Sequence, residues 1–437
     1  MDSHNKGIVK YFLLSILFIF TTLLYAQTGE PIIKEGETLN VERCIEIALK
    51  LHPSIMKSRY EVMIKQSQLG QAKAGYFPKV DVTTGYTRNS LVRKTDDPYN
   101  TGMGNFNYNN ASVTLNQTIY DFGKTPTDVN IKKLDLESSK HDLDDALITL
   151  TNSVRLSYYS SLKAKRTKDV NKEAVDQYKE HLAQAKLFFE AGKKPKYDVT
   201  KAEVDLSNAK LDLIGAENDF NIATVTLRNA IGLELPARFE IEDNLSPQEY
   251  RIPLEDALSK AYQNRADLRS LAAQKDASAK SIEFARKEYY PKITGSAAYN
   301  FTGSQFPLEQ GANAGVALSM NIFEGYSTVN KVEEARAKMK SLEAKIETVK
   351  LQILLEIQQA YLNLQQAKEK ITNTEIQMKQ AAENLELATL RYKAGLGSLL
   401  EVTDATVASN KARLVNISAL YDYRIAQANI EKAMGNK

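Results

Sequence analysis

Residues 111–121 read ASVTLNQTIYD and residues 314–324 read AGVALSMNIFE, and the two segments align without a gap at an offset of 203 residues. The same offset pairs Tyr158 with Tyr361 and Gly192 with Gly395. Upstream, an offset of 213 residues pairs the Tyr-x-Pro-Lys motifs that begin at Tyr76 and Tyr289. The ten residues by which the two offsets differ fall in one polar loop. An internal duplication of about 190 residues predicts a chain built from two equivalent structural units.

Four segments of the chain have the two-residue alternation of a β-strand, at about 80–87, 111–119, 293–302 and 315–322. In the second of them, Val113 and Leu115 alternate with Ser112 and Thr114, so one face is apolar and the other small and polar. Each segment has the length that a tilted strand needs to cross an outer membrane. Four strands cannot close a barrel, so several chains would have to share one. The alternative is a pair of hairpins packed on helices in a soluble protein.

The rest of the chain has mostly helical periodicity, so the predicted fold class is mainly α with a small β part. Long helices are expected at about 127–190 and 330–393, and return helices at about 198–231 and 399–434. Alanine recurs at every seventh residue of each return helix, from Ala202 to Ala230 and from Ala405 to Ala433. A heptad seam with alanine at one of its positions predicts left-handed supercoiling and close helix packing. A spectrin-like or free coiled coil is the alternative for this pattern.

The two ends of the chain and the junction between the repeats set the expected domain boundaries. Residues 1–26 have a basic start, an apolar stretch and a small residue, Ala26, before the expected cleavage, which is typical of a signal peptide. An N-terminal extension is expected at 27–38, the first repeat at 39–232, a linker at 233–252 and the second repeat at 253–437. The full chain has 57 lysine and arginine residues and 54 aspartate and glutamate residues, a net charge of +3, which does not suggest a nucleic-acid partner.

Residues that could support catalysis or metal binding are sparse. The four histidines have no metal-ligand spacing, and Cys44, the single cysteine, lies in a helical pattern where we expect it to be buried. We therefore expect no enzymatic activity, no metal site and no cofactor.

The turns between the long helices carry the most distinctive motifs. Residues 391–405, RYKAGLGSLLEVTDA, closely resemble the C-terminal hairpin of the TolC family of outer-membrane efflux proteins, and residues 189–199, FEAGKKPKYDV, resemble its first hairpin. The resemblance covers about Leu39 to Lys437. It implies a homotrimer in which a 12-stranded barrel, embedded in outer-membrane lipid, continues into a long helical barrel in the periplasm. It also implies an exit duct that conducts passively and is joined to an inner-membrane transporter by a periplasmic adaptor (membrane fusion protein).

The resemblance also assigns expected roles to residues of the turns. Glu401 and Asp404 would supply acidic rings at the pore constriction, which would favour cations and raise one another's pKa values by repulsion. Asp198 and Tyr392 match positions that tie neighbouring hairpins in the closed state. Gly397 stands where some relatives have an arginine that takes part in this lock.

The expected adaptor-docking surface is formed by residues at the ends of both turns: Ala191, Gly192, Ala394, Gly395 and Leu396. These tip residues also have a purely structural explanation, because glycine ends helices and Asp198 and Glu401 fall in first helical turns, where carboxylates are favoured.

From the duplication, the paired strands and the family resemblance, the chain is interpreted as an outer-membrane exit duct of a tripartite efflux or type I secretion system, located in the outer membrane of a Gram-negative bacterium. A secreted or periplasmic coiled-coil scaffold without a pore is the alternative, and the sequence does not indicate the substrate.

Overall fold

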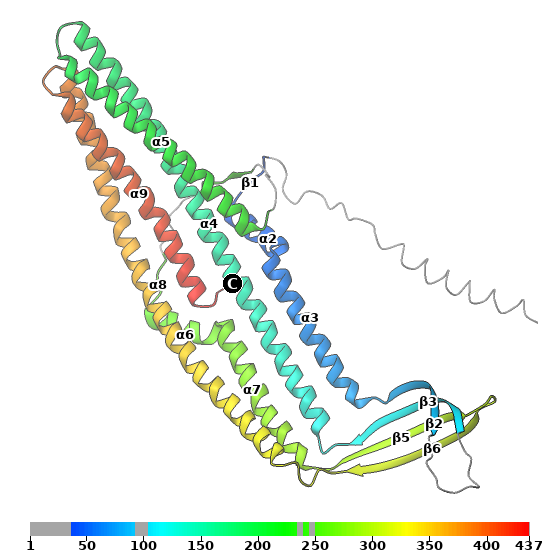
Figure 1. Cartoon of the computed structure of the whole chain (residues 1–437). Helices are drawn as coiled ribbons and strands as arrows, with labels where there is room; N and C mark the ends of the chain where they lie inside the picture. Colours follow the sequence, from blue (N-terminus) through cyan, green and yellow to red (C-terminus); the bar gives the residue numbers. More distant parts are fainter. Residues whose placement is uncertain (1–35, 92–103, 234–238, 244–249, 437) are drawn as a thin grey trace, which may run out of the picture.

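The computed structural model describes residues 36–91, 104–233, 239–243 and 250–436. The expected signal peptide at 1–26 and most of the expected N-terminal extension lie outside these residues. The described chain is a long, slightly bent wall of helices with a β-sheet at one end and two helical turns at the other (Figure 1).

Each repeat has the same order of elements: two short helices, two strands, a long helix and a return helix. The first repeat contains α2 (Val41–Leu51), α3 (Pro53–Lys73), β2 (Lys79–Leu91), β3 (Gly104–Tyr120), α4 (Lys124–Glu190) and α5 (Lys196–Ile231). The second contains α6 (Leu254–Asn264), α7 (Ala266–Arg286), β5 (Lys292–Gly303), β6 (Glu309–Ser319), α8 (Ser327–Lys393) and α9 (Leu399–Ala433). Short 3-10 turns, η1 (Ala74–Tyr76) and η2 (Lys287–Tyr289), lead from the short helices into the strands.

The two long helices give the molecule its length. Both α4 and α8 have 67 residues, and at 1.5 Å per residue each extends about 100 Å. In the half nearer the turns, the helices lie side by side in the order α5, α4, α9, α8 (Figure 1). In the half nearer the sheet, α3 and α7 take the places of α5 and α9 beside α4 and α8. Helices α5 and α8 therefore form edges of the wall in its turn-proximal half.

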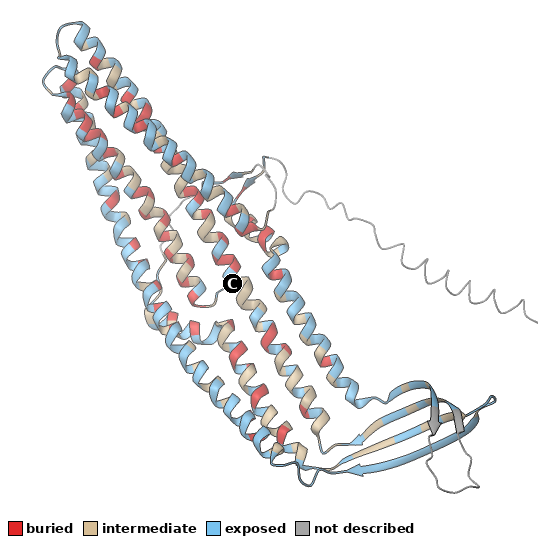
Figure 2. Ribbon diagram, in the orientation of Figure 1, coloured by how far each residue is buried: buried red, intermediate tan, exposed pale blue. Residues whose placement is uncertain are grey.

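The alanine ladder predicted from the sequence lies in the contacts between these helices, which confirms its packing role. Its alanines in α9 are buried at Ala405, Ala412, Ala419, Ala426 and Ala433, and those in α5 at Ala202, Ala209, Ala216 and Ala230. Because alanine has the smallest apolar side chain, the helices can pack closely along their whole length. Figure 2 shows buried residues recurring along the long helices and the return helices, whereas α3 is almost entirely exposed or intermediate.

The sheet has four antiparallel strands in the order β2-β3-β5-β6. Val82 faces Val113 across β2 and β3, and Val113 faces Tyr299 across β3 and β5, so the apolar positions share one face. This face is open to the surroundings, and Val82 is 75% exposed. Neither β2 nor β6 has a strand partner on its outer edge in the part of the chain that the structure describes.

Several element bounds differ from those predicted. Strands β2 and β3 are longer than the expected 80–87 and 111–119 and continue into polar sequence, where pairing with each other maintains them. Strand β6 covers Glu309–Ser319 instead of 315–322, because β5 begins at Lys292, opposite Ser319, and leaves residues 320–322 without a partner. The long helices begin three residues earlier than expected, and α5 two residues earlier.

The expected linker at 233–252 contributes to the core near the middle of the wall. Its strand β4 (Glu240–Ile241) pairs in parallel with β1 (Thr38–Leu39) near the N-terminus. Tyr158 of α4 lies against both strands, with its hydroxyl 2.6 Å from the carbonyl oxygen of Glu242 and 3.2 Å from that of Leu39. Cys44 is fully buried in the same cluster, as predicted.

Candidate functional site

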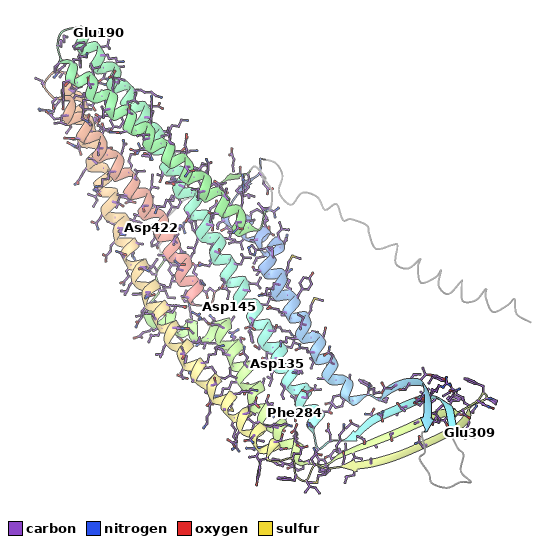
Figure 3. All side chains as sticks on the ribbon, viewed as in Figure 1. Asp135, Asp145, Glu190, Phe284, Glu309 and Asp422 are labelled. Atoms are coloured by element: carbon purple, nitrogen blue, oxygen red, sulfur yellow. The ribbon has the colours of Figure 1, made fainter. Side chains whose placement is uncertain are left out.

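The candidate site is the end of the helical wall, where two turns lie next to each other. The first tip, residues 191–195, joins α4 to α5, and the second tip, residues 394–398, joins α8 to α9. Figure 3 shows Glu190, next to the first tip, at the opposite end of the molecule from Glu309 in the sheet.

Glycine determines the backbone path of both tips. Gly192 and Gly395 have φ values of 68° and 75°, the left-handed conformation predicted from the sequence. This conformation turns the chain so that the Lys193 N–H donates to the Phe188 carbonyl at 2.9 Å, and the Leu396 N–H donates to the Arg391 carbonyl at 2.9 Å. The expected docking residues Ala191, Gly192, Ala394, Gly395 and Leu396 are all exposed.

Ser398 and Glu401 form a capping box at the start of α9, which confirms the predicted cap. The Ser398 hydroxyl accepts from the Glu401 N–H at 3.2 Å, and the Glu401 carboxylate accepts from the Ser398 N–H at 3.3 Å. Such a reciprocal pair satisfies backbone donors that the first helical turn leaves free. Glu401 is therefore held by its own hairpin.

Glu401 also has a cationic partner, whereas Asp404 does not. The Arg391 guanidinium, on the last turn of α8, lies 3.5 Å from the Glu401 carboxylate. The pKa of Glu401 is lowered, chiefly because the Ser398 N–H donates to it, with Arg391 as a further cause. Asp404 is exposed one turn along α9 and has no hydrogen-bond or ion-pair partner among the described residues. The two carboxylates expected to act together thus differ in their surroundings.

Tyr392 lies in an apolar cluster that joins the two hairpins of one chain. It is fully buried, with its ring 5.5 Å from that of Phe188, and the cluster also contains Ala185, Ala202, Ala388, Leu399, Val402 and Ala405. Its hydroxyl has no hydrogen-bond partner among the described residues. Burial raises the pKa of Tyr392, and the carboxylate of Asp198 raises it further. Asp198 therefore acts on Tyr392 through its charge, without a hydrogen bond between them.

Lys194 makes a contact between the tips that the sequence did not reveal. Its ammonium group donates to the Gly397 carbonyl oxygen at 3.1 Å and lies 5.4 Å from the centre of the Tyr392 ring. A Cβ at position 397 would lie 3.2 Å from both the Arg391 Cβ and the Tyr392 N, so a side chain there would force a shift. The lysine-rich divergence of the first tip from its repeat partner was the available signal.

Behind the tips, a buried polar cluster connects α4, α5 and α9. Asp205 of α5 is buried, pairs with Lys201 and accepts from the Thr403 hydroxyl of α9 at 3.3 Å. His181 of α4 lies 3.5 Å from the Thr406 hydroxyl, and burial lowers the pKa of this histidine. This cluster adds polar specificity to the apolar contact between the hairpins.

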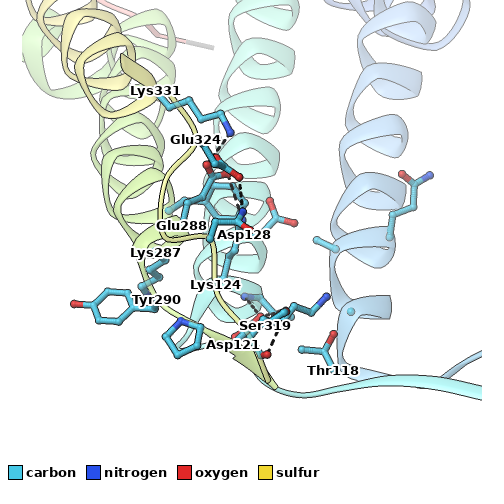
Figure 4. Close-up of a pocket in the computed structure, with 18 residues that line it drawn as sticks. Thr118, Asp121, Lys124, Asp128, Lys287, Glu288, Tyr290, Ser319, Glu324 and Lys331 are labelled. Atoms are coloured by element: carbon cyan, nitrogen blue, oxygen red, sulfur yellow. Dashed lines mark hydrogen bonds and ion pairs between the residues drawn. The ribbon is translucent and has the colours of Figure 1, made fainter. Parts of the chain in front are cut away.

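A polar cavity of about 530 Å³ lies at the other end of the wall, where helices meet strands (Figure 4). Glu288 there pairs with Lys124 at 3.3 Å and Lys331 at 2.7 Å, and Lys287 donates to the Gly123 carbonyl at 2.9 Å. These pairs hold η2, α4 and α8 together at the junction. Within the described ranges, no cluster of side chains suits a metal ion, and no helix is long and apolar enough to span a membrane.

The duplicated long hairpins, joined to one four-stranded sheet, define an elongated and mainly helical class of protein. The family described as outer membrane efflux protein matches residues 44–233 and 257–436, once in each repeat, and the chain belongs to this family. It is an outer-membrane channel of the efflux or secretion type that extends into the periplasm.

Individual relatives are distant in sequence and close in fold. The outer membrane protein TolC of Escherichia coli is 20% identical over 412 residues, which cover 91% of this chain and 82% of TolC. The CyaE protein of Bordetella pertussis is 22% identical over 378 residues, 84% of this chain and 78% of CyaE. The CmeC outer membrane channel of Campylobacter jejuni superposes with a TM-score of 0.82 at 17% identity, over 94% of this chain and 90% of CmeC.

Proposed function

We propose that the chain forms a homotrimeric exit duct that passively conducts substrates delivered by an inner-membrane transporter through a periplasmic adaptor. Three copies would supply twelve strands for a barrel in outer-membrane lipid and a continuous ring of helices in the periplasm. The family resemblance supports three chains per duct. The unpartnered edges of the single chain support closure of its helices and strands into a ring with neighbouring copies.

The observation that carries this proposal is a second apolar face on each edge helix. Helix α5 buries its alanines against the wall, yet it also exposes a stripe formed by Val204, Leu211, Ile214, Ile222 and Val225. Helix α8, on the opposite edge, exposes Leu351, Leu355, Leu362, Ile376, Leu387 and Leu390. A helix that is apolar on two faces needs two neighbours. Edge to edge, α5 of one copy and α8 of the next can cover each other, while β2 and β6 pair in the sheet.

For the periplasmic end, we propose that the tips form the gate. Asp404 would provide the free acidic ring at the constriction, and Glu401 a second ring whose charge Arg391 offsets. Tyr392, Asp198 and Lys194 would hold the tips together in the closed state. The exposed residues Ala191, Gly192, Ala394, Gly395 and Leu396 would contact the adaptor.

Reconstitution of the purified mature chain in planar bilayers tests the duct. We expect a trimer by native mass spectrometry and cation-selective single channels. Replacing the stripe residue Leu211 by glutamate is expected to reduce trimer formation, whereas the same change at exposed Ala408 of α9 is not. A monomer without conductance, or recovery of the native protein solely in soluble cell fractions, would exclude the duct and favour a scaffold.

The gate assignment has its own test. A Glu401→Ala, Asp404→Ala double variant is expected to lose most of the cation preference. Unchanged selectivity in this variant would remove both residues from the constriction while leaving the duct itself intact.

A further inference from the structure

The outer surface of the first tip carries lysines that its own chain does not neutralise. The side chains of Lys193 and Lys196 are exposed and form no ion pair or hydrogen bond with any described residue. Lysines behind the tip are paired: Lys186 lies 3.7 Å from Glu203, and Lys201 pairs with Asp205. Positive charge therefore remains available at the very end of this hairpin.

Large apolar side chains are also exposed at the two tips. Tyr197 is 71% exposed at the start of α5, and Leu396 of the second tip is 75% exposed. Large exposed apolar groups bordered by charge are typical of protein contact surfaces, and tyrosine is among the residues that contribute most to binding.

The backbone that presents these groups is already fixed. Gly192 and Pro195 set the turn, and the N–H groups of Lys193 and Lys194 both donate to the Phe188 carbonyl, at 2.9 and 3.3 Å. Little backbone entropy would be lost on binding, so even a small contact area can be effective.

We propose that the first tip binds an acidic segment at the end of the adaptor, with Lys193 and Lys196 providing charge recognition and Tyr197 an apolar anchor. This inference rests on the proposed function and names the chemistry of the partner. The second tip has leucine at all three corresponding positions, 396, 399 and 400. The two tips therefore make different contacts: an electrostatic one at the first and an apolar one at the second. Three copies of the chain would then present two alternating kinds of docking point.

A protein is a better candidate than an anionic lipid surface for the partner that binds the first tip. The tips would surround the mouth of the proposed duct, and a conducting path must continue beyond them. A ring of adaptor hairpins can continue that path, whereas a bilayer pressed against the tips would close it. Charge complementarity also speeds association and fixes orientation, which an assembly around a central path requires.

Photo-crosslinking of the full-length protein in its native host tests the proposal. The benzophenone amino acid p-benzoylphenylalanine is introduced at position 197 or, in a second strain, at position 396, and the crosslinked peptide is sequenced by mass spectrometry. The test variant is Lys193→Glu with Lys196→Glu. The matched control is Lys340→Glu with Lys345→Glu, two exposed lysines of α8 that lie toward the sheet and have no ion-pair partner among the described residues.

We expect position 197 to crosslink to a segment rich in aspartate and glutamate, and the yield to fall at least about tenfold in the test variant but not in the control. Exchanging the acidic residues of the crosslinked segment for lysine should restore the yield with the test variant. A crosslink to a neutral or basic segment, or a yield that charge reversal leaves unchanged, overturns the inference. So does the absence of a protein crosslink combined with charge-dependent binding to phosphatidylglycerol vesicles. In each of these cases, normal crosslinking at position 396 and normal conductance would show that the proposed duct still stands.

Discussion

Replacing Arg391 by glutamine is expected to make the channel more cation-selective, although the substitution is not at an acidic residue. Arg391 lies 3.5 Å from Glu401, so in each chain the arginine offsets the charge of this carboxylate. Asp404 is exposed and has no such cationic partner among the described residues. In the proposed trimer, Arg391→Gln would leave three additional carboxylates without a cationic partner.

The size of the effect follows from Coulomb's law. A permeating ion about 7 Å from a unit charge in water interacts with it by about RT, which changes its local concentration by a factor of about 2.7. Three such charges give a factor of about 20 at low ionic strength, and screening at 0.1 M salt reduces this to about 5. The reversal potential across a tenfold KCl gradient measures the change, and it should be larger at low salt.

Three controls make the result decisive. Lys393→Gln removes an equal charge near the same tip from a residue with no ion pair among the described residues, and it should have a smaller effect. Arg391→Gln with Glu401→Gln should return to the selectivity of the natural protein, and Asp404→Asn should reduce the cation preference. If Arg391→Gln lowers or preserves the cation preference, or if the double variant behaves as the single one does, the proposed charge balance is wrong.

Three further predictions concern contacts at the tips, which we propose to be the gate, and in the helices behind them. Lys194→Met removes the hydrogen bond to the Gly397 carbonyl, which we propose helps to hold the tips closed, so single-channel conductance should rise several-fold. Lys193→Met is the control and should leave the conductance unchanged. Equal conductance in the two variants would show that Lys194 does not hold the tips closed. Ala412 is 1% exposed, so Ala412→Leu forces a larger side chain into a packed seam and should lower the free energy of unfolding by about 1–3 kcal/mol. The measurement is the thermal midpoint, which should fall. Ala408→Leu, on the exposed face of the same helix, is the control and should leave the midpoint unchanged. Burial lowers the pKa of His181, so the unfolded chain binds a proton more readily, and stability should decline as the pH falls below about 6.5. His181→Gln should flatten the dependence of the thermal midpoint on pH, and parallel profiles would contradict this.

Sequence patterns predicted the parts of the fold in which one periodicity dominates. The heptad spacing from Ala405 to Ala433 corresponds to a real packing seam, because every one of these alanines is buried. The ends of the strands were harder to predict. Polar residues occupy both faces of β3 near Asn107 and Asn110, so alternation disappears there while hydrogen bonding to β2 continues. At the end of β6, apolar alternation continues to Ile322, but no partner strand reaches it.

The site was predictable where it depends on backbone geometry and less so where it depends on contacts between hairpins. The left-handed glycines and the Ser398 cap follow from neighbouring residues, and both are present. The hydrogen bond from Lys194 to Gly397 joins residues 203 positions apart and depends on how the two hairpins pack. The lysines that distinguish the first tip did not indicate which residue would accept it. Arg391 and Glu401 lie in one hairpin, yet their pairing was not predicted either, because it depends on the width of the turn between them.

The two-faced edge helices have a consequence for biogenesis. Between export and membrane insertion, a newly folded single chain would expose the apolar stripes of α5 and α8 and the open outer edges of strands β2 and β6. Such a chain is prone to aggregation, because each of these surfaces can associate with many partners other than its proper neighbour. The apparent stability of the protein would also depend on the concentration of single chains, because assembly into the proposed trimer covers these surfaces. Slow production, holding chaperones or rapid capture by the membrane would therefore determine the yield of channels as much as the stability of the finished wall.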